Sequence, residues 1–333
     1  MNEAVIIAAK RTAFGKYGGK LRHLEPELLL KPLFNYLKNN FPAIVNNIDD
    51  VILGNVIGNG GNIARKALLE AGLNQQVPGV TVDRQCGSGL EAVNQACRMI
   101  QAGAGSIYIA GGVESTSRAP WKIKRPQSVY DTHLPEFYER ASFAPQGQDP
   151  SMIQAAENVA ERYGISRFEQ DEFAWHSHQK TLDAYNHRKI TQEITPLMIK
   201  GETFQQDESI KPKLTQQTLN RLKPLLPNGS ITAGNCCMKN DGAVLLLVME
   251  KTFAKAYGIH SGLSFIDQVT IGVDPNILGI GPVPAIEKLL AKQQLYLNDI
   301  DAIELNEAFA SQVLASQQAL NVPAEKLNIM VAR

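Results

Sequence analysis

The sequence predicts an α/β layered fold whose sheet is largely buried. Apolar runs of strand length alternate along the chain with stretches in which apolar residues recur at helical spacing. This alternation is typical of sheets that are covered by helices. The chain has 333 residues, which is more than one ordinary hydrophobic core accommodates, so we expect two or three subdomains.

The alternation is regular over the first third of the chain. It predicts a strand at Val5–Ala9, a helix at Glu25–Lys38, a strand at Val51–Asn55, a helix at Ala64–Ala71, a strand at Val77–Val82, a helix at Leu90–Gln101 and a strand at Ile107–Gly111. The strand that ends at Val82 runs into a glycine-rich turn at Cys86. This cysteine is therefore expected where a strand passes directly into a helix.

The middle of the chain has a different character. From about Ser115 to Leu226 it is richer in Pro, Gln and charged residues, and it lacks a regular strand rhythm. Two helices are expected in this stretch, at Met152–Tyr163 and Gln170–Arg188. We interpret the stretch as an inserted domain.

The alternation returns after the insertion. The apolar run within Gly242–Glu250 predicts a strongly buried strand. A second α/β unit is then expected, with a strand at Leu263–Val273, a helix at Val283–Lys292, a strand at Ile300–Glu304, a helix at Ala308–Leu320 and the start of a strand at Leu327–Val331.

Composition and charge exclude several classes of protein. Hydrophobic residues make up 44% and charged residues 20%, as in soluble globular proteins. The 33 Lys and Arg balance the 33 Asp and Glu, so no basic field indicates nucleic acid or a membrane surface as a partner. The N-terminus has no basic segment before its short apolar run, and no apolar stretch approaches the ~20 residues that span a bilayer. We expect a cytoplasmic protein.

The cysteines do not have the spacing of a metal site. They are at positions 86, 97, 236 and 237, they form no Cys-x-x-Cys pair, and no histidine stands at ligand spacing from them. We therefore expect no bound metal and, in a reducing compartment, no disulfides.

Cys86 is the first candidate for chemistry. It stands in Gln85-Cys86-Gly87-Ser88-Gly89, between a predicted strand and a predicted helix. The positive end of a helix dipole stabilises a thiolate, and helical N–H groups can donate to an oxyanion. A nucleophilic cysteine is one interpretation. A buried structural cysteine in a tight turn is the other, and the pattern alone does not choose between them.

Three further features have two interpretations each. Cys97 lies in an apolar helix, where structural burial is favoured over reactivity. The polar, glycine-bearing segment Thr232–Gly242 contains Cys236 and Cys237 and leads into a buried strand, so it is either a ligand-contacting loop or a plain turn. Asn306 precedes a predicted helix and is either its N-cap or a placed amide that holds a water or an oxyanion.

Six motifs together resemble the thiolases, from residue 1 to about residue 328. They are Asp83–Val93, Gly111–Pro120, Ala156–Ala160, Thr232–Gly242, Gly279–Ala285 and Asp301–Phe309. Their order and approximate spacing agree with that family. The resemblance implies a five-layered αβαβα fold made of two similar halves, 1–117 plus 240–258 and an incomplete 259–333. The inserted loop domain at 118–239 would then bind CoA.

The resemblance also implies roles for single residues. Cys86 would accept an acyl group from an acyl-CoA as a thioester, and Asn306 would hold the water that completes an oxyanion hole. Ala233 and Cys237 would lie along the pantetheine of CoA, while Met152 and Phe309 would line the acyl and pantetheine channel. Acyl-CoA and CoA would be substrates, so no separate cofactor is expected. Thiolases are dimers or tetramers, which implies a homodimer or homotetramer and a role in fatty acid metabolism.

The sequence departs from the thiolase pattern in three places. Cys237-Met238 replaces a usual Ser-Gly, and Ser151-Met152-Ile153 replaces a common His-Met-Gly. The 333 residues also contain neither the Gly-His-Pro motif, whose His activates the nucleophile, nor the Cys-x-Gly motif, whose Cys moves the α-carbon proton. We therefore expect a C-terminally truncated thiolase with impaired Claisen activity. The alternative is a non-catalytic relic that binds CoA or acyl groups.

A third possibility, a ketoacyl synthase of the same fold, is less favoured. It would need two His, or a His and an Asn, in the second half, and only Asn306 fits this requirement.

Overall fold

The computed structural model describes residues 2–58, 60–126, 128–130, 132–138, 140, 142–187 and 189–329. The chain divides into two compact units. The sheet unit comprises Met1–Pro120, Thr191–Ser209 and Lys239–Ile266. The helical unit comprises Trp121–Ile190, Ile210–Met238 and Asp267–Arg333.

The sheet unit contains a seven-stranded sheet and its covering helices. Its elements are β1 (Ala4–Arg11), β2 (Gly15–Lys16), α1 (Pro26–Asn40), α2 (Pro42–Val45), β3 (Asp50–Gly54), α3 (Ile63–Glu70), β4 (Gly79–Val82), α4 (Ser88–Gln101), β5 (Ile107–Ser115), η1 (Thr116–Arg118), β6 (Leu197–Ile199), β7 (Glu202–Phe204), β8 (Asn240–Glu250), α8 (Lys251–Ala256) and β9 (Leu263–Ser264). The strand order is β4-β3-β5-β8-β1-β9, and β2 pairs with β8. β6 and β7 form a separate hairpin.

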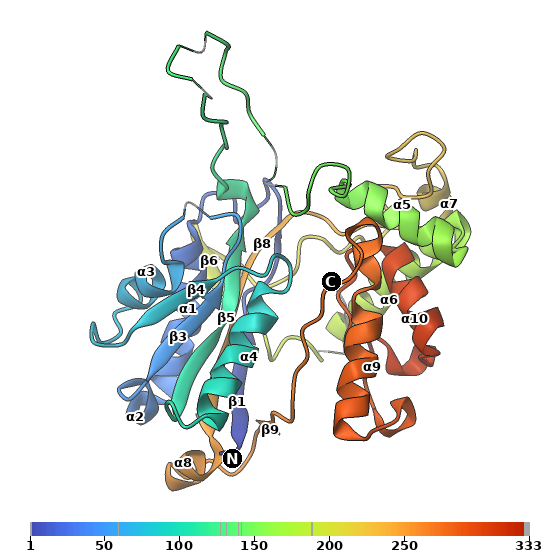
Figure 1. Ribbon diagram of the computed structural model, residues 1–333. Coiled ribbons are helices and arrows are strands. Elements are labelled where there is room, and N and C mark those ends of the chain that lie inside the picture. The colour runs from blue at the N-terminus through green and yellow to red at the C-terminus, as the bar shows by residue number, and fades with distance from the viewer. Residues whose placement is uncertain are drawn as a thin grey trace. The chain divides into compact units, whose positions relative to one another are not determined.

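The strands of the sheet are apolar on both faces, and helices cover both faces to form the core. β3 is parallel to β4 and β5, whereas β8 is antiparallel to both β5 and β1. On one face, Ala92, Ala96 and Ile100 of α4 pack against Ile52 of β3 and Val248 of β8. α1 and α3 pack together on the other side of the sheet (Figure 1). This two-sided burial explains why the strands are continuous apolar runs in the sequence.

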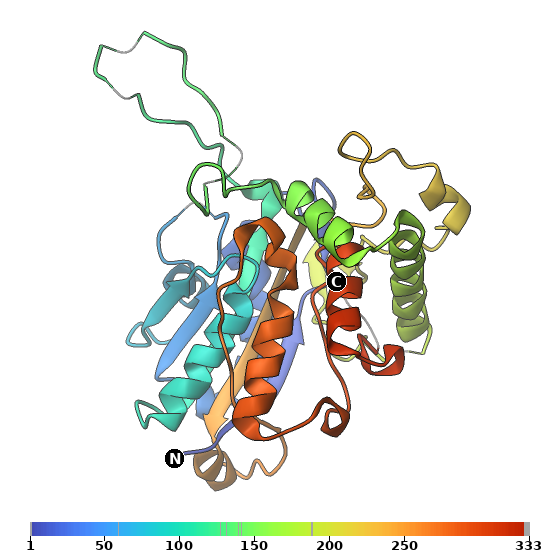
Figure 2. The same cartoon turned by 45° about the vertical axis from the view of Figure 1, so that its right-hand side comes forward.

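The helical unit packs its helices around α10. Its elements are α5 (Met152–Tyr163), α6 (Arg167–Asn186), α7 (Gln216–Asn220), η2 (Pro275–Ile280), α9 (Pro282–Gln293), η3 (Leu297–Asp299), α10 (Ala310–Leu320) and η4 (Ala324–Lys326). The red α10 lies against the green α5 and α6 (Figure 2). Residues 232–238, the polar loop, also belong to this unit.

Local sequence signals fix where the green helices begin and end. The Ser151 side chain caps the start of α5, and Gly164 ends it in the left-handed conformation with φ 66°. Ser166 and Glu169 form a capping box at the start of α6.

The helix predictions are confirmed to within a few residues, but two strand predictions are wrong. Of the predicted strand Leu263–Val273, only Leu263–Ser264 joins a ladder. Of Ile300–Glu304, only Ile303 is bridged, to Leu327. A strand requires a hydrogen-bonded neighbour, and the described residues give these two segments almost none. Residues 330 and 331 of the predicted strand Leu327–Val331, and the predicted helix end at Arg188, lie outside the described residues.

Among the described residues, each helix is too short or too polar to cross a membrane.

Candidate active site

Cys86 lies in the turn that joins β4 to α4, in the sheet unit. Its side chain is exposed, so the alternative of a buried structural cysteine does not hold. α4 begins two residues later at Ser88, with Gly87 as its N-cap residue. The N–H groups of the first helical turn, and with them the positive end of the helix dipole, therefore stand next to the thiol.

Hydrogen bonds inside the turn fix its shape. Ser88 Oγ accepts from the N–H of Arg84 at 2.7 Å and donates to the carbonyl oxygen of Gln85 at 2.6 Å. The N–H of Gln85 donates to Asp83 Oδ1 at 2.8 Å. Gln85 itself has φ 50°, in the left-handed region that a residue with a side chain rarely adopts. The residue before Cys86 thus carries backbone strain that these bonds hold in place, which is common at functional turns.

Close packing against the sheet sets the height of the turn. A Cβ placed on Gly54 of β3 would lie 2.5 Å from the carbonyl carbon of Ser88 and 2.6 Å from the nitrogen of Gly89. A Cβ on Gly112 of β5 would lie 3.3 Å from the Cα of Gly89. A side chain at position 54 would therefore push the first turn of α4 away from the sheet, and Cys86 with it.

A buried carboxylate stands at the end of β5. Glu114 accepts from the N–H groups of Val56 and Ile57 and, at 2.9 Å, from Asn55 Nδ2. Burial raises the pKa of Glu114, the backbone N–H groups of Val56 and Ile57 oppose the increase, and the negative charge of Asp83 adds to it. This side chain attaches the loop after β3 to the end of β5.

In the helical unit, the polar loop pairs with the segment that precedes α10. Cys236 and Phe309 form an antiparallel bridge, and the N–H of Cys237 donates to the carbonyl oxygen of Ala308 at 2.9 Å. Ala233 and Cys237 are exposed, and Phe309 is half-buried. Three residues predicted to contact CoA therefore lie in one paired piece of structure.

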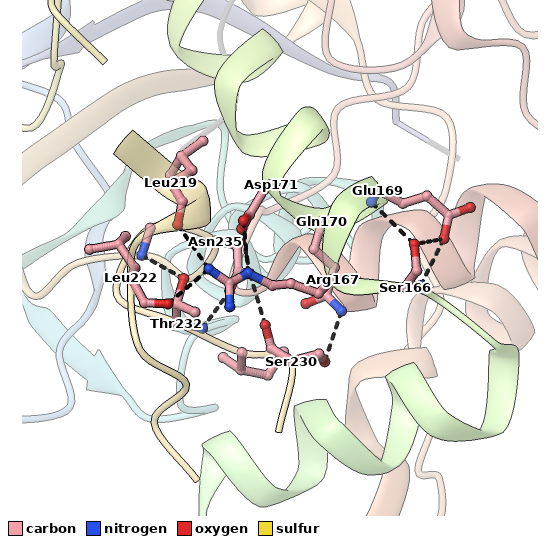
Figure 3. Close-up of polar contacts among 12 residues, drawn as sticks. Ser166, Arg167, Glu169, Gln170, Asp171, Leu219, Leu222, Ser230, Thr232 and Asn235 are labelled. Atoms are coloured by element: carbon pink, nitrogen blue, oxygen red, sulfur yellow. Dashed lines mark hydrogen bonds and ion pairs between the residues drawn. The ribbon is translucent and has the colours of Figure 1, made fainter. Parts of the chain in front are cut away.

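Asn235 is the buried centre of the polar loop. It is 3% exposed, and its Oδ1 accepts from the N–H of Thr232 at 2.7 Å. Its Nδ2 donates to Asp171 Oδ1 at 2.9 Å and to the carbonyl oxygen of Ser230 at 3.1 Å (Figure 3). The second carboxylate oxygen of Asp171 accepts from Nε of Arg167 at 2.7 Å. The ion pair of Arg167 and Asp171 on α6 therefore holds the Asn235 side chain, which closes the turn of the polar loop.

A second carboxylate holds the residues just before the polar loop. Glu157 of α5 accepts from the N–H groups of Ser230 and Ile231, each at 2.7 Å, and from Ser230 Oγ at 2.8 Å. The fully buried Gln170 donates to the same hydroxyl oxygen at 2.9 Å (Figure 3). Helices α5 and α6 therefore both contribute to the shape of this segment.

Asn306 lies in an irregular segment and is exposed. The N-cap residue of α10 is Phe309, so the interpretation of Asn306 as a helix cap is wrong. The side chain of Asn328 forms hydrogen bonds with the residues on both sides of Asn306. Its Oδ1 accepts from the N–H of Leu305 at 2.8 Å, and its Nδ2 donates to Glu307 Oε1 at 2.9 Å.

The six predicted site residues are divided between the two units. Cys86 belongs to the sheet unit, and the other five belong to the helical unit. Within the helical unit, Ala233, Cys237 and Phe309 lie together. The exposed Met152 begins α5, and Asn306 lies three residues before Phe309.

Sequence reasoning missed Asn235 and Asp171. Asn235 lies within a motif that the sequence singled out, between Gly234 and Cys236, so its position was a usable signal. Asp171 lies 64 residues earlier in the chain than Asn235. No local pattern connects the two.

A metal site has no support in the described ranges of the chain. Among these residues, no group of three or more His, Cys, Asp or Glu is arranged to hold a metal ion.

Two family models and several relatives identify the class of protein. The thiolase N-terminal domain model matches residues 4–252, and the thiolase C-terminal domain model matches residues 263–331. The chain belongs to the thiolase family. The thiolase fold predicted from its motifs is thereby confirmed, whereas the predicted domain boundaries stay a prediction.

Individual relatives give a finer comparison. The chain is 65% identical over 328 residues to Staphylococcus epidermidis VraB, whose provisional name is acetyl-CoA C-acetyltransferase, covering 98% of this chain and 86% of VraB. The crystal structure of the Bacillus anthracis acetyl-CoA acetyltransferase is 36% identical with a TM-score of 0.94, over 100% of this chain and 86% of that one. Human mitochondrial 3-ketoacyl-CoA thiolase in complex with CoA is 32% identical with a TM-score of 0.92, over 99% of this chain and 86% of that one.

Proposed function

We propose that this thiolase transfers an acyl group from an acyl-CoA to Cys86 as the first step of making or cleaving a 3-ketoacyl-CoA. The exposed thiol at the strained turn between β4 and α4 carries this proposal. The step is balanced: Cys86 Sγ forms a bond to the carbonyl carbon of the thioester, the bond from that carbon to the CoA sulfur breaks, and the thiol proton leaves on CoA–SH. Covalent transfer divides a difficult carbon–carbon bond change into two easier steps.

The exposed residues of the polar loop favour a CoA thioester as the substrate. Ala233 and Cys237 are exposed on it, and it is paired with the segment of Phe309. In the proposal this surface contacts pantetheine, Met152 and Phe309 line the channel, and Asn306 holds a water for an oxyanion. Because CoA thioesters serve as substrates, the proposal includes no separate cofactor.

The proposal separates acyl transfer from carbon–carbon bond formation. The first step is acylation of Cys86, and Claisen condensation is a later step whose rate is measured separately.

Radiolabelled acetyl-CoA tests the proposal directly. After acid quenching, one acetyl group is expected on the peptide that contains Cys86, and Cys86→Ala should abolish it. Cys97→Ala, which changes a fully buried thiol on the helix α4 that follows Cys86, should leave the label in place. Wild-type protein that carries no acetyl thioester would refute the proposal.

The same experiment distinguishes the second candidate function. A non-catalytic relic would bind CoA but acquire no label. Cleavage of acetoacetyl-CoA at ordinary thiolase rates would instead exclude both the relic and the impaired enzyme.

We further propose a homo-oligomer in the cytoplasm. Residues 121–126, 128–130 and 132–138, called the arm, fold back on one another: the N–H of Lys124 donates to the carbonyl oxygen of Glu136 at 2.9 Å, and the N–H of Tyr138 donates to that of Lys122 at 3.0 Å (Figure 1). Large apolar side chains are exposed along the arm, which suits contact with a second copy. The four cysteines, all within the described residues, are not joined in disulfides, as suits a reducing compartment.

A further inference from the structure

We propose that Asn235 is a positioning residue that holds the polar loop in its ligand-binding conformation, so that CoA binds a preformed surface. The inference rests on the proposed function, because it concerns the same CoA site. Its basis is the buried side-chain amide of Asn235, whose oxygen and nitrogen both form hydrogen bonds. The oxygen accepts from the N–H of Thr232, and the nitrogen donates to Asp171 and to the carbonyl oxygen of Ser230.

These bonds shape the turn that presents Ala233. The side chain of Asn235 reaches back three residues to Thr232 and closes the turn around Ala233 and Gly234. The N–H of Gly234 donates to Thr232 Oγ1 at 3.1 Å. Ala233 is exposed while Thr232 and Asn235 are buried. The turn thus points one small residue outward from a rigid base.

Arg167 and Asp171 fix that base from α6. Asp171 is 2% exposed, and it binds Arg167 with one oxygen and Asn235 with the other. Arg167 also donates through Nη2 to the carbonyl oxygens of Leu219 at 2.8 Å and Leu222 at 3.0 Å. The side chains of these two leucines lie directly against Gly234, so that a Cβ there would overlap both of them. Arg167 therefore fixes the residues under the turn, and Asp171 fixes the turn itself.

The backbone of Asn235 connects the polar loop to the other side of the proposed site. Its carbonyl oxygen accepts from the N–H of Ala310 at 2.9 Å, at the first residue of α10. The segment with Asn306 and Phe309 ends at this point. One buried residue therefore holds together both pieces of chain assigned to CoA. A preformed surface avoids the cost of ordering loops when the ligand binds.

The test compares CoA affinity with the reactivity of Cys86. Asn235→Asp keeps the volume, removes both donors and places a second carboxylate against Asp171. We expect CoA to bind at least about 10-fold more weakly by calorimetry, because the loop must then be ordered by the ligand. Alkylation of Cys86 by iodoacetamide should proceed at the wild-type rate, and the buried Cys97 should stay protected, whereas a general loss of structure would expose Cys97 to the reagent. Asn228→Asp, at an exposed position in the preceding segment, is the matched control and should leave the affinity unchanged.

A second substitution tests the pairing itself. In Asp171→Asn with Asn235→Asp, the new amide can again donate to the new carboxylate, so part of the CoA affinity should return. If Asn235→Asp does not fold, Asp171→Asn alone takes its place, with weaker CoA binding expected and unchanged alkylation of Cys86.

The outcomes separate this inference from the proposed function. Suppose that the wild-type protein binds CoA and that Asn235→Asp, or Asp171→Asn in its place, binds CoA equally well. This result would overturn the role of Asn235 and leave the proposed function standing. A wild-type protein that does not bind CoA would overturn the proposed function, and the positioning role with it.

Discussion

At the scale of single residues, two cysteines near each other in sequence have opposite surroundings. Cys86 is exposed in its turn, whereas Cys97 is fully buried on the helix α4 that follows this turn. Burial raises the pKa of Cys97 to about 11, although the neighbouring Arg98 acts in the opposite direction. Because the thiolate is the reactive form, Cys97 is inert near neutral pH. The sequence alone separated the two, since one lies in a glycine-rich turn and the other in an apolar helical stretch.

Glu114 gives a pH-dependent prediction at this scale. Burial raises its pKa in the folded protein above the ordinary 4.5. Just above pH 4.5 the unfolded chain has lost this proton while the folded chain retains it, so the folded state is disfavoured as pH rises. The stability from Glu114 is thus present below pH 4.5 and lost as pH rises through the higher folded pKa. Glu114→Gln should flatten this part of the stability curve, measured by urea unfolding at a series of pH values.

The control for Glu114→Gln is Glu287→Gln. Glu287 is exposed on α9, and its replacement should preserve the wild-type slope. An unchanged slope in Glu114→Gln would contradict the buried-carboxylate argument.

At the scale of elements, the contact between α4 and the sheet connects stability with the position of Cys86. Gly54→Ala should destabilise the fold by about 1–3 kcal/mol, because its Cβ would lie 2.5 Å from the backbone of Ser88. It should also slow acetylation of Cys86, since the turn moves with the helix. Urea unfolding and the acetyl-CoA label measure the two effects.

Gly89→Ala is the matched control within α4. A Cβ on Gly89 would meet its nearest neighbour, the carbonyl oxygen of Gly111, at 3.9 Å. Alanine is the better helix former by about 1 kcal/mol, so this variant should be as stable as the wild type or more so. Equal stability losses for the two substitutions would show that close packing at Gly54 is not the cause.

The elements also show what a sequence can predict. The helix at Met152–Tyr163 was predicted with its observed bounds, because its apolar spacing and its limits at Ser151 and Gly164 are local. The strand expected at Ile300–Glu304 has suitable residues, yet among the described ranges only Ile303 finds a bridge partner. Strand formation depends on a distant neighbour, which the apolar pattern of one segment does not report.

At the scale of the whole molecule, distant segments combine in ways that no single motif predicts. The sheet unit is assembled from three separate parts of the chain. Arg11 of β1, for example, pairs with Asp207 at 2.8 Å and with Glu193 at 2.7 Å. In the proposed site, Cys86 and the Thr232–Gly242 segment were found from the sequence because their motifs are continuous. The buried pair of Asp171 and Asn235 was not found, because burial and pairing emerge only on folding.

Self-association through the arm is the remaining prediction at this scale. Val129 is 93% exposed and Leu134 is 87% exposed, so neither contributes to the core of its own chain. Val129→Asp with Leu134→Asp should therefore preserve the melting temperature of the subunit but place charges in an apolar contact between copies. The expected result is a smaller assembly than the wild type by sedimentation velocity. Met198→Asp, at another exposed apolar position (68%) outside the arm, should keep the wild-type assembly. A double variant that sediments like the wild type would assign self-association to a different surface.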